Sequence, residues 1–162
     1  GIDEFNNSIP FSPDTLMDDD RNDYEMFVDR YFTDSYWNIV IETHLDLYGT
    51  SGTYITEKTW KPIRHNQPFV IIGTIGSLSH LRDLGYKTFD GFIDESYDYE
   101  KTDHIRFTKA LSVIHELNTK SLEELNEINF QIKDIVQHNS KLFNAPKRAR
   151  LMKLIEQLLN NE

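Results

Sequence analysis

The chain has 162 residues, a formal net charge of −10 at pH 7 and no cysteine. A chain of this length can bury about two-thirds of its unfolded surface, so we expect a single domain with one core. The absence of cysteine excludes a disulfide framework, a thiolate nucleophile and a cysteine-based zinc site, and no apolar run approaches the roughly 20 residues that span a bilayer. We therefore expect a cytoplasmic protein without a membrane span or a signal peptide.

The acidic charge is concentrated at the N-terminus. Residues 1–34 contain ten acidic residues against Arg21 and Arg30, whereas the other 128 residues carry a net charge of only −2. An acidic field repels nucleic acid, so we expect no nucleic-acid partner. The run Asp18–Asp20 is typical of solvated surface, and a metal site is the alternative. The start at Gly1 rather than Met leads us to expect a trimmed tag or an excised fragment of a longer protein.

Two short apolar runs predict buried strands. Tyr36–Thr43 (YWNIVIET) is rich in β-branched and aromatic residues, and Pro68–Gly73 (PFVIIG) is a continuous apolar run that a glycine ends. Between them, Thr56 can cap a short helix that runs to about His65, which Pro62 should limit or kink. The order strand, helix, strand predicts parallel pairing.

Helices dominate the rest of the predicted structure. Residues 76–84 have the apolar spacing of a helix that Gly85 ends, and Lys87–Ile93 has the composition of a third, short strand. Apolar residues then recur at helical spacing from about Tyr99 to Leu117, and again from about residue 147 to 159. The residues Ser121-Leu122-Glu123-Glu124 form a capping box that opens a further helix. We therefore expect an α/β fold with a parallel sheet flanked by helices and an all-helical C-terminal part.

The segment Tyr54-Ile55-Thr56-Glu57-Lys58 has the chemistry of an anion site. If Thr56 caps a helix, the free N–H groups of the first turn attract a phosphate. Lys58 adds a positive charge where the helix dipole disfavours a cation, which favours a functional reason for it, such as a bound phosphate that Lys58 and the amides both contact. Glu57 suits a ribose diol, and Tyr54 suits stacking on a base. The alternative is that these are ordinary exposed helix residues and that Tyr54 fills the core.

Two other segments are weaker candidates. The loop Gly73-Thr74-Ile75-Gly76-Ser77 joins a strand to a helix that Ser77 can cap, and its glycines would let the backbone approach a ligand. A structural turn is the alternative, since the loop matches no phosphate-binding fingerprint. The acidic run Asp94–Glu100 precedes a helix, where carboxylates favour the dipole, and a metal site is again the alternative. The histidines show no metal-ligand spacing, and only His44, at a strand end, is a candidate.

The run IVIETHL, a spacer, YITEKTWKPI and then QPFVIIGT resembles the C-terminal nucleotide-binding region of the family 10 α-1,3-fucosyltransferases. Exostosin-type transferases show a looser version. The match covers about residues 36–75, and its core is the near-identical YITEK. The resemblance implies that Glu57 contacts the ribose of a nucleoside-diphosphate sugar, such as a GDP-sugar, and that Lys58 contacts its phosphates. It implies supporting roles for Tyr54 and Glu42, whereas Thr43 replaces the asparagine of the family and puts that contact in doubt.

The resemblance also implies a GT-B-like fold of two Rossmann-like domains, with the donor nucleotide in the C-terminal one. Only one such domain fits in this chain. We expect the chain to consist of an acidic segment at 1–34, a Rossmann-like donor-binding core at 35–98 and a helical part at 99–162 that packs on the same domain. The expected function is to bind the nucleotide-sugar donor of a glycosyltransferase. The N-terminal domain that would bind the glycan acceptor is expected to be missing from this chain. No catalytic residue is assigned. No tightly bound cofactor or metal is expected.

Two alternatives from other functional classes stay open. The first is a non-catalytic binding or interaction module derived from such a transferase domain. The second is a metal-dependent hydrolase that uses Asp94, Glu95 and Asp98. Binding of a nucleoside diphosphate would favour the transferase, and metal-dependent stabilisation without nucleotide would favour the hydrolase.

Overall fold

A computed structural model describes residues 32, 34–45 and 53–146 of the chain. The acidic segment up to residue 31, including Asp18–Asp20, and the predicted helix at 147–159 lie outside these residues. In the described part, no helix is both long and apolar enough to cross a membrane. The elements in chain order are β1 (Asn38–Ile41), α3 (Glu57–Arg64), β2 (Phe69–Ile72), α4 (Ser77–Asp83), the 3₁₀ helix η2 (Ser96–Tyr99), α5 (Asp103–Thr119), α6 (Leu122–Gln131) and α7 (Lys133–Asn144).

The two predicted strands form a parallel sheet, as their order in the chain indicates. Asn38 is paired with Phe69 at one end and Ile41 with Ile72 at the other. The N–H of Glu42 continues the ladder beyond β1 by donating to the carbonyl of Ile72 at 2.9 Å. The locations of both strands were predicted correctly. Their ends were not, because each strand is shorter than the apolar run that predicted it. The fold is mixed α/β, with a two-stranded sheet in the described residues.

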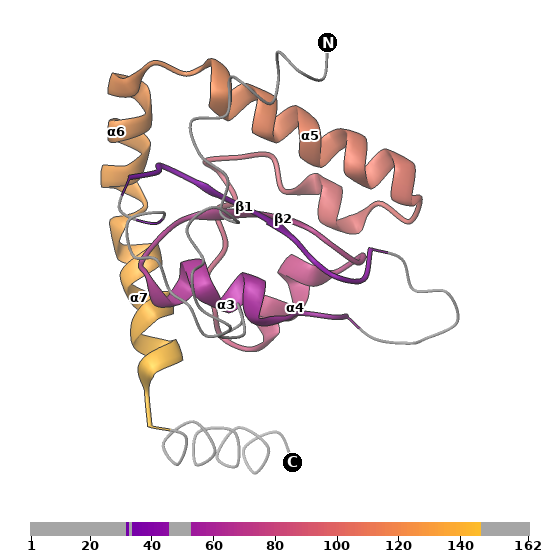
Figure 1. The fold of residues 1–162 in the computed structure, drawn as a ribbon, viewed down its shortest axis with the longest axis horizontal. Helices are drawn as coiled ribbons and strands as arrows, with labels where there is room; N and C mark the ends of the chain where they lie inside the picture. Colours follow the sequence, from indigo (N-terminus) through magenta and orange to yellow (C-terminus); the bar gives the residue numbers. More distant parts are fainter. Residues whose placement is uncertain (1–31, 33, 46–52, 147–162) are drawn as a thin grey trace, which may run out of the picture.

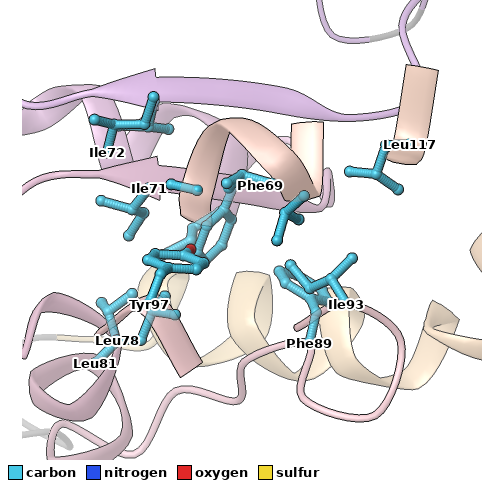
Figure 2. Close-up of a cluster of buried hydrophobic side chains, with 14 of the residues drawn as sticks. Phe69, Ile71, Ile72, Leu78, Leu81, Phe89, Ile93, Tyr97 and Leu117 are labelled. Atoms are coloured by element: carbon cyan, nitrogen blue, oxygen red, sulfur yellow. The ribbon is translucent and has the colours of Figure 1, made fainter. Parts of the chain in front are cut away.

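Helices cover both faces of this sheet (Figure 1). α5 lies on one side of the strands, and α3 and α4 lie on the other, while α7 packs against α3. Successive side chains of β2 therefore pack against helices on opposite sides of the sheet, because side chains alternate between the two faces of a strand. Figure 2 shows Phe69 and Ile71 on the side of Phe89 and Tyr97, with Ile72 pointing the opposite way. All four residues of β2 are buried, which explains its unbroken apolar sequence.

β1 is the less protected of the two strands. Val40 is buried, but Ile39 and Ile41 on the other face remain 40% and 55% exposed. They share their face with Val70 and Ile72, their partners in the register, which are buried at 0% and 9% exposure. α5 contacts β2, and the side chains of Ile39 and Ile41 in β1 remain partly exposed.

The expected third strand in Lys87–Ile93 does not form. The segment contains only an isolated bridge between Asp90 and Ile93. The N–H groups of Phe92 and Ile93 both donate to the carbonyl of Phe89, at 3.0 and 3.1 Å, which closes a turn. Gly91 lies in this turn at φ +86°, a left-handed conformation that favours glycine. The aromatic residues that suggested a strand instead pack into the core as loop side chains, and Phe89 is completely buried.

The helical C-terminal part is confirmed over the described residues, with different boundaries. α5 begins at Asp103 rather than near Tyr99, since residues 96–99 form the separate 3₁₀ helix and Thr102 is extended. The predicted capping box is present, with Ser121 and Glu124 bonded to each other's backbone N–H groups at 3.2 and 2.7 Å. The helix that it opens is interrupted at Ile132, after which α7 begins.

Candidate functional site

The residues singled out in the sequence meet at the carboxyl ends of β1 and β2. The N–H of Tyr54 donates to Thr74 Oγ1 at 3.3 Å, which joins the segment before α3 to the loop after β2. A Cβ atom on Gly73 would lie 3.4 Å from Glu42 Cγ, so the ends of the two strands are in close contact. This edge of the sheet therefore collects the predicted set: Glu42, Thr43, Tyr54, Thr56, Glu57, Lys58, Gly73, Thr74, Gly76 and Ser77.

Thr56 caps α3 as predicted, and Glu42 completes the cap. Thr56 Oγ1 accepts from the N–H of Lys58 at 3.3 Å. The carboxylate of Glu42, which is only 2% exposed, accepts from Thr56 N at 3.0 Å, Thr56 Oγ1 at 2.5 Å and Thr59 Oγ1 at 2.6 Å. A carboxylate at a helix N-terminus is favoured by the dipole. The sequence did not reveal that part of the anion site would be filled by the chain's own carboxylate.

Few main-chain donors remain free in the first turn of α3. The N–H of Thr56 is bonded to Glu42, and that of Lys58 to the Thr56 hydroxyl. The N–H of Thr59 reaches the carbonyl of Thr56 at 3.2 Å. Glu57 N is thus the first-turn amide for which the described residues supply no acceptor. An external anion would find one amide here rather than the several that an open helix end presents.

Lys58 supplies the positive charge of this edge. Its ammonium donates to Thr43 Oγ1 at 3.2 Å, and both side chains are exposed. This bond holds the ammonium beside the residue that follows Glu42, at the end of β1. Within the described part of the chain, no carboxylate lies in ion-pair contact with Lys58.

The loop after β2 is tightly fixed. A Cβ atom on Gly73 would also lie 3.1 Å from Ser77 Oγ, closer than most real contacts, so a larger residue would force a shift. The carbonyl of Gly73 accepts from Arg106 Nε at 3.0 Å. The buried guanidinium of Arg106 donates as well to the carbonyls of Glu100 and Leu45, at 2.9 and 2.8 Å, and pairs with Asp103. One side chain of α5 therefore ties together the segments that follow both strands.

Ser77 does not cap α4, which corrects the sequence prediction. Gly76 occupies the cap position at φ +78°, and Ser77 is the first helical residue, whose hydroxyl donates to the carbonyl of Thr74 at 2.7 Å. The cap comes from Asp98, whose two carboxylate oxygens accept from the N–H groups of Leu78 and Ser79, both at 2.9 Å. Asp98 is 1% exposed, so the chain itself fills this helix end.

Two aromatic side chains stand at the edge of the site. The rings of His44 and Tyr54 make an edge-to-face contact with centroids 4.6 Å apart. Tyr54 is 49% exposed and is therefore not a core residue. A half-exposed aromatic ring offers a face to a planar ligand.

The acidic run Asp94–Glu100 holds the fold together. Asp94 Oδ1 accepts from the N–H of Ser96, and this hydrogen bond lowers the pKa of Asp94. Glu95 accepts from Arg82, Thr88 and the N–H of Phe89, at 3.0, 2.7 and 2.6 Å. In the part of the chain that the structure describes, no three acidic or histidine side chains are grouped to hold a metal ion.

Two side chains organise this edge, Arg106 and Asp98. The sequence analysis missed Arg106, and it named Asp98 only within the acidic run and as a candidate metal ligand, not as a helix cap. Arg106 carried a usable signal, because it lies at helical spacing from the buried Ala110, Val113 and Leu117. A charged residue in the apolar stripe of a helix must find partners inside the fold. Asp98 carried no such signal, since its acceptor role depends on a helix twenty residues earlier in the chain.

Comparison with known proteins adds no relationship, since no family model, no curated protein and no solved structure matches this chain.

Proposed function

We propose that the carboxyl edge of the sheet binds the diphosphate of a nucleotide sugar, and that the chain is the donor-binding domain of a glycosyltransferase. In this proposal the two-stranded sheet is the core of a Rossmann-like domain, one half of a GT-B-like enzyme. A separate domain would bind the glycan acceptor. The proposal rests on the resemblance of the YITEK region and on the chemistry that gathers at this edge.

The placement of Lys58 is the observation that carries the proposal. Its ammonium stands at the N-terminal turn of α3, where the helix dipole opposes a cation. It donates to the neutral hydroxyl of Thr43, and none of the described carboxylates neutralises it. An anionic ligand at the strand ends would gain a charge-assisted contact with this ammonium and would offset the unfavourable dipole.

The neighbouring groups are assigned roles that fit their surroundings. Glu42 is buried, and its carboxylate already accepts hydrogen bonds from Thr56 and Thr59, so it cannot reach a ligand. It acts instead as a positioning residue that holds the start of α3. Glu57, half-buried in the first turn, offers a carboxylate to a ribose hydroxyl and a free amide to a phosphate oxygen. The exposed ring of Tyr54 would stack on the base.

The test is calorimetric titration of GDP and UDP into the wild type and into Lys58→Ala. Removal of a charge-assisted contact worth about 1.5–3 kcal/mol should lower the affinity about ten- to a hundredfold. The melting temperature without ligand should stay the same or rise slightly, because an unfavourable charge leaves the helix N-terminus. Glu57→Gln should weaken binding less, since its ribose partner is neutral.

Lys87→Ala is the matched control, because Lys87 is also an exposed lysine but lies beyond the far end of α4. It should leave the affinity unchanged. Detectable binding with equal affinity in the wild type and Lys58→Ala would place the nucleotide elsewhere. If neither nucleotide binds, the chain is better explained as a non-catalytic interaction module.

A further inference from the structure

The outer edge of β1 is a row of main-chain groups that the described residues leave unpaired. The N–H of Asn38 donates to the carbonyl of Pro68 at 2.9 Å, so the main-chain groups of Asn38 point toward β2. Because these groups point to alternate edges along a strand, those of Ile39 and Ile41 point away from β2. No described group is hydrogen-bonded to them there.

The same two residues expose apolar side chains on one face of the sheet. Ile39 and Ile41 are partly exposed, and the register places them on the face of Ile72. Figure 2 shows Ile72 on the opposite side of its strand from Leu78 and Leu81 of α4. Since α4 and α5 lie on opposite sides of the strands in Figure 1, the exposed isoleucines lie on the side of α5.

β1 lacks the features that keep an exposed edge strand from pairing. Natural edge strands are protected by a lysine, a proline or a bulge. The stretch Trp37–Ile41 contains no charged residue and no proline, and its register with β2 is continuous. In a chain with a net charge of −10, this neutral strip is a place where a second copy meets little electrostatic repulsion.

The edge of β1 is complementary to itself. If two copies lie antiparallel about a two-fold axis through Val40, Ile39 of one copy stands opposite Ile41 of the other. Both residues direct their main-chain groups outward, so each such pair exchanges two N–H···O=C bonds. Opposed residues share a face of the sheet, so the isoleucines of both copies form one apolar cluster.

A second copy covers the exposed face as well as the edge. The joined sheet places β2 and its symmetry mate about 14 Å apart, which is three strand spacings. Packed helices lie about 8–10 Å apart, so α5 and its mate, each in contact with β2, flank the isoleucine cluster closely. A single extended peptide would pair with the edge but would bring no helix to this face.

We propose that the chain forms a reversible two-fold dimer in which β1 pairs antiparallel with β1 of a second copy. Each strand has four residues, so the contact belongs to the small interfaces, below about 1,200 Å² in total, which are weak. The expected Kd is about 10–100 µM. The dimer does not depend on the nucleotide proposal, since Ile39, Val40 and Ile41 belong to no predicted ligand contact.

Sedimentation velocity of the wild type from about 5 to 500 µM tests this association. A shift from monomer to dimer is expected as the concentration rises, and it should be larger at high salt, because copies with a net charge of −10 repel each other. Ile41→Lys should stay monomeric. Ile105→Lys, the same change at a similarly exposed isoleucine outside β1, is the matched control and should associate like the wild type.

Circular dichroism shows whether each variant is folded, so a lost dimer is not confused with a lost fold. A wild type that stays monomeric at the highest concentration in high salt would overturn the proposal. A folded Ile41→Lys that still forms the dimer would overturn it too.

Cysteine cross-linking tests the antiparallel register, since the chain has no cysteine of its own. An equimolar mixture of Ile39→Cys and Ile41→Cys chains should form a disulfide-linked dimer on mild oxidation, because opposed residues lie about 5.5 Å apart at Cα. Either variant alone should cross-link far less, since its cysteines are two positions out of register and lie beyond the roughly 7 Å that a disulfide spans. Cross-linking of Ile39→Cys alone as fast as the mixture would contradict the proposed pairing.

Discussion

Arg106→Ala is expected to destabilise the chain by about 3–5 kcal/mol, the cost of breaking a buried charged network. The guanidinium donates to the carbonyls of Gly73, Glu100 and Leu45, and the side chain is 3% exposed. Truncation leaves these carbonyls without their donor and opens a cavity beneath α5. Urea unfolding followed by circular dichroism measures the loss.

The partner in the ion pair gives the matched control for Arg106. Asp103 is 43% exposed, so Asp103→Ala removes a solvent-screened pair worth less than about 1 kcal/mol. Arg106→Lys retains the charge without the planar fork of donors and should lie between the two. If Asp103→Ala were as destabilising as Arg106→Ala, the ion pair rather than the three carbonyl contacts would carry the stability.

Glu42→Ala should cost about 3–4 kcal/mol, because three hydrogen bonds to a charged, buried acceptor are lost together. The N–H of Thr56 and the hydroxyl of Thr59 would be left without their acceptor at the start of α3. Buried polar groups cannot turn to solvent, so the first turn of α3 should loosen. Thermal melting measures the stability, and hydrogen exchange of the amides at 57–60 locates the change.

Glu42→Gln tests whether the carboxylate acts through hydrogen bonds. The amide keeps one oxygen for Thr56 N and Thr59 Oγ1, and its NH₂ can donate to Thr56 Oγ1, which already accepts from Lys58 N. The loss should therefore be only about 1 kcal/mol. A loss as large as that of Glu42→Ala would show that the negative charge at the helix end, rather than the hydrogen bonds, stabilises α3.

Local sequence signals predicted the elements that depend on neighbouring residues. The apolar runs located both strands, and their separation by a helix predicted the parallel pairing. Thr56 and Ser121 predicted two helix starts, because an N-cap bonds to residues two or three positions away. Lys87–Ile93 failed as a strand because its composition suits both a strand and a buried loop, and only pairing across the sheet distinguishes them.

The sequence predicted which residues belong to the candidate site but not the contacts that they make with one another. The residues that follow β1 and β2 were expected at one edge, because parallel strands bring their carboxyl ends together. No local pattern indicated that Glu42 would accept from donors of α3, so that among the described residues only the amide of Glu57 in the first turn lacks an acceptor.

The α/β order, the parallel pairing and the caps at Thr56 and Ser121 follow from apolar periodicity or from contacts a few residues apart, so the sequence was enough to predict them. The carboxylates at the starts of α3 and α4, and the link that Arg106 makes between the two strand ends, became known only from the folded chain. A buried polar group bonds to whichever partner the packing brings within about 3 Å, and that partner can be far away in the sequence. Glu42 and Asp98 reach their partners across fourteen and twenty residues, beyond any local pattern.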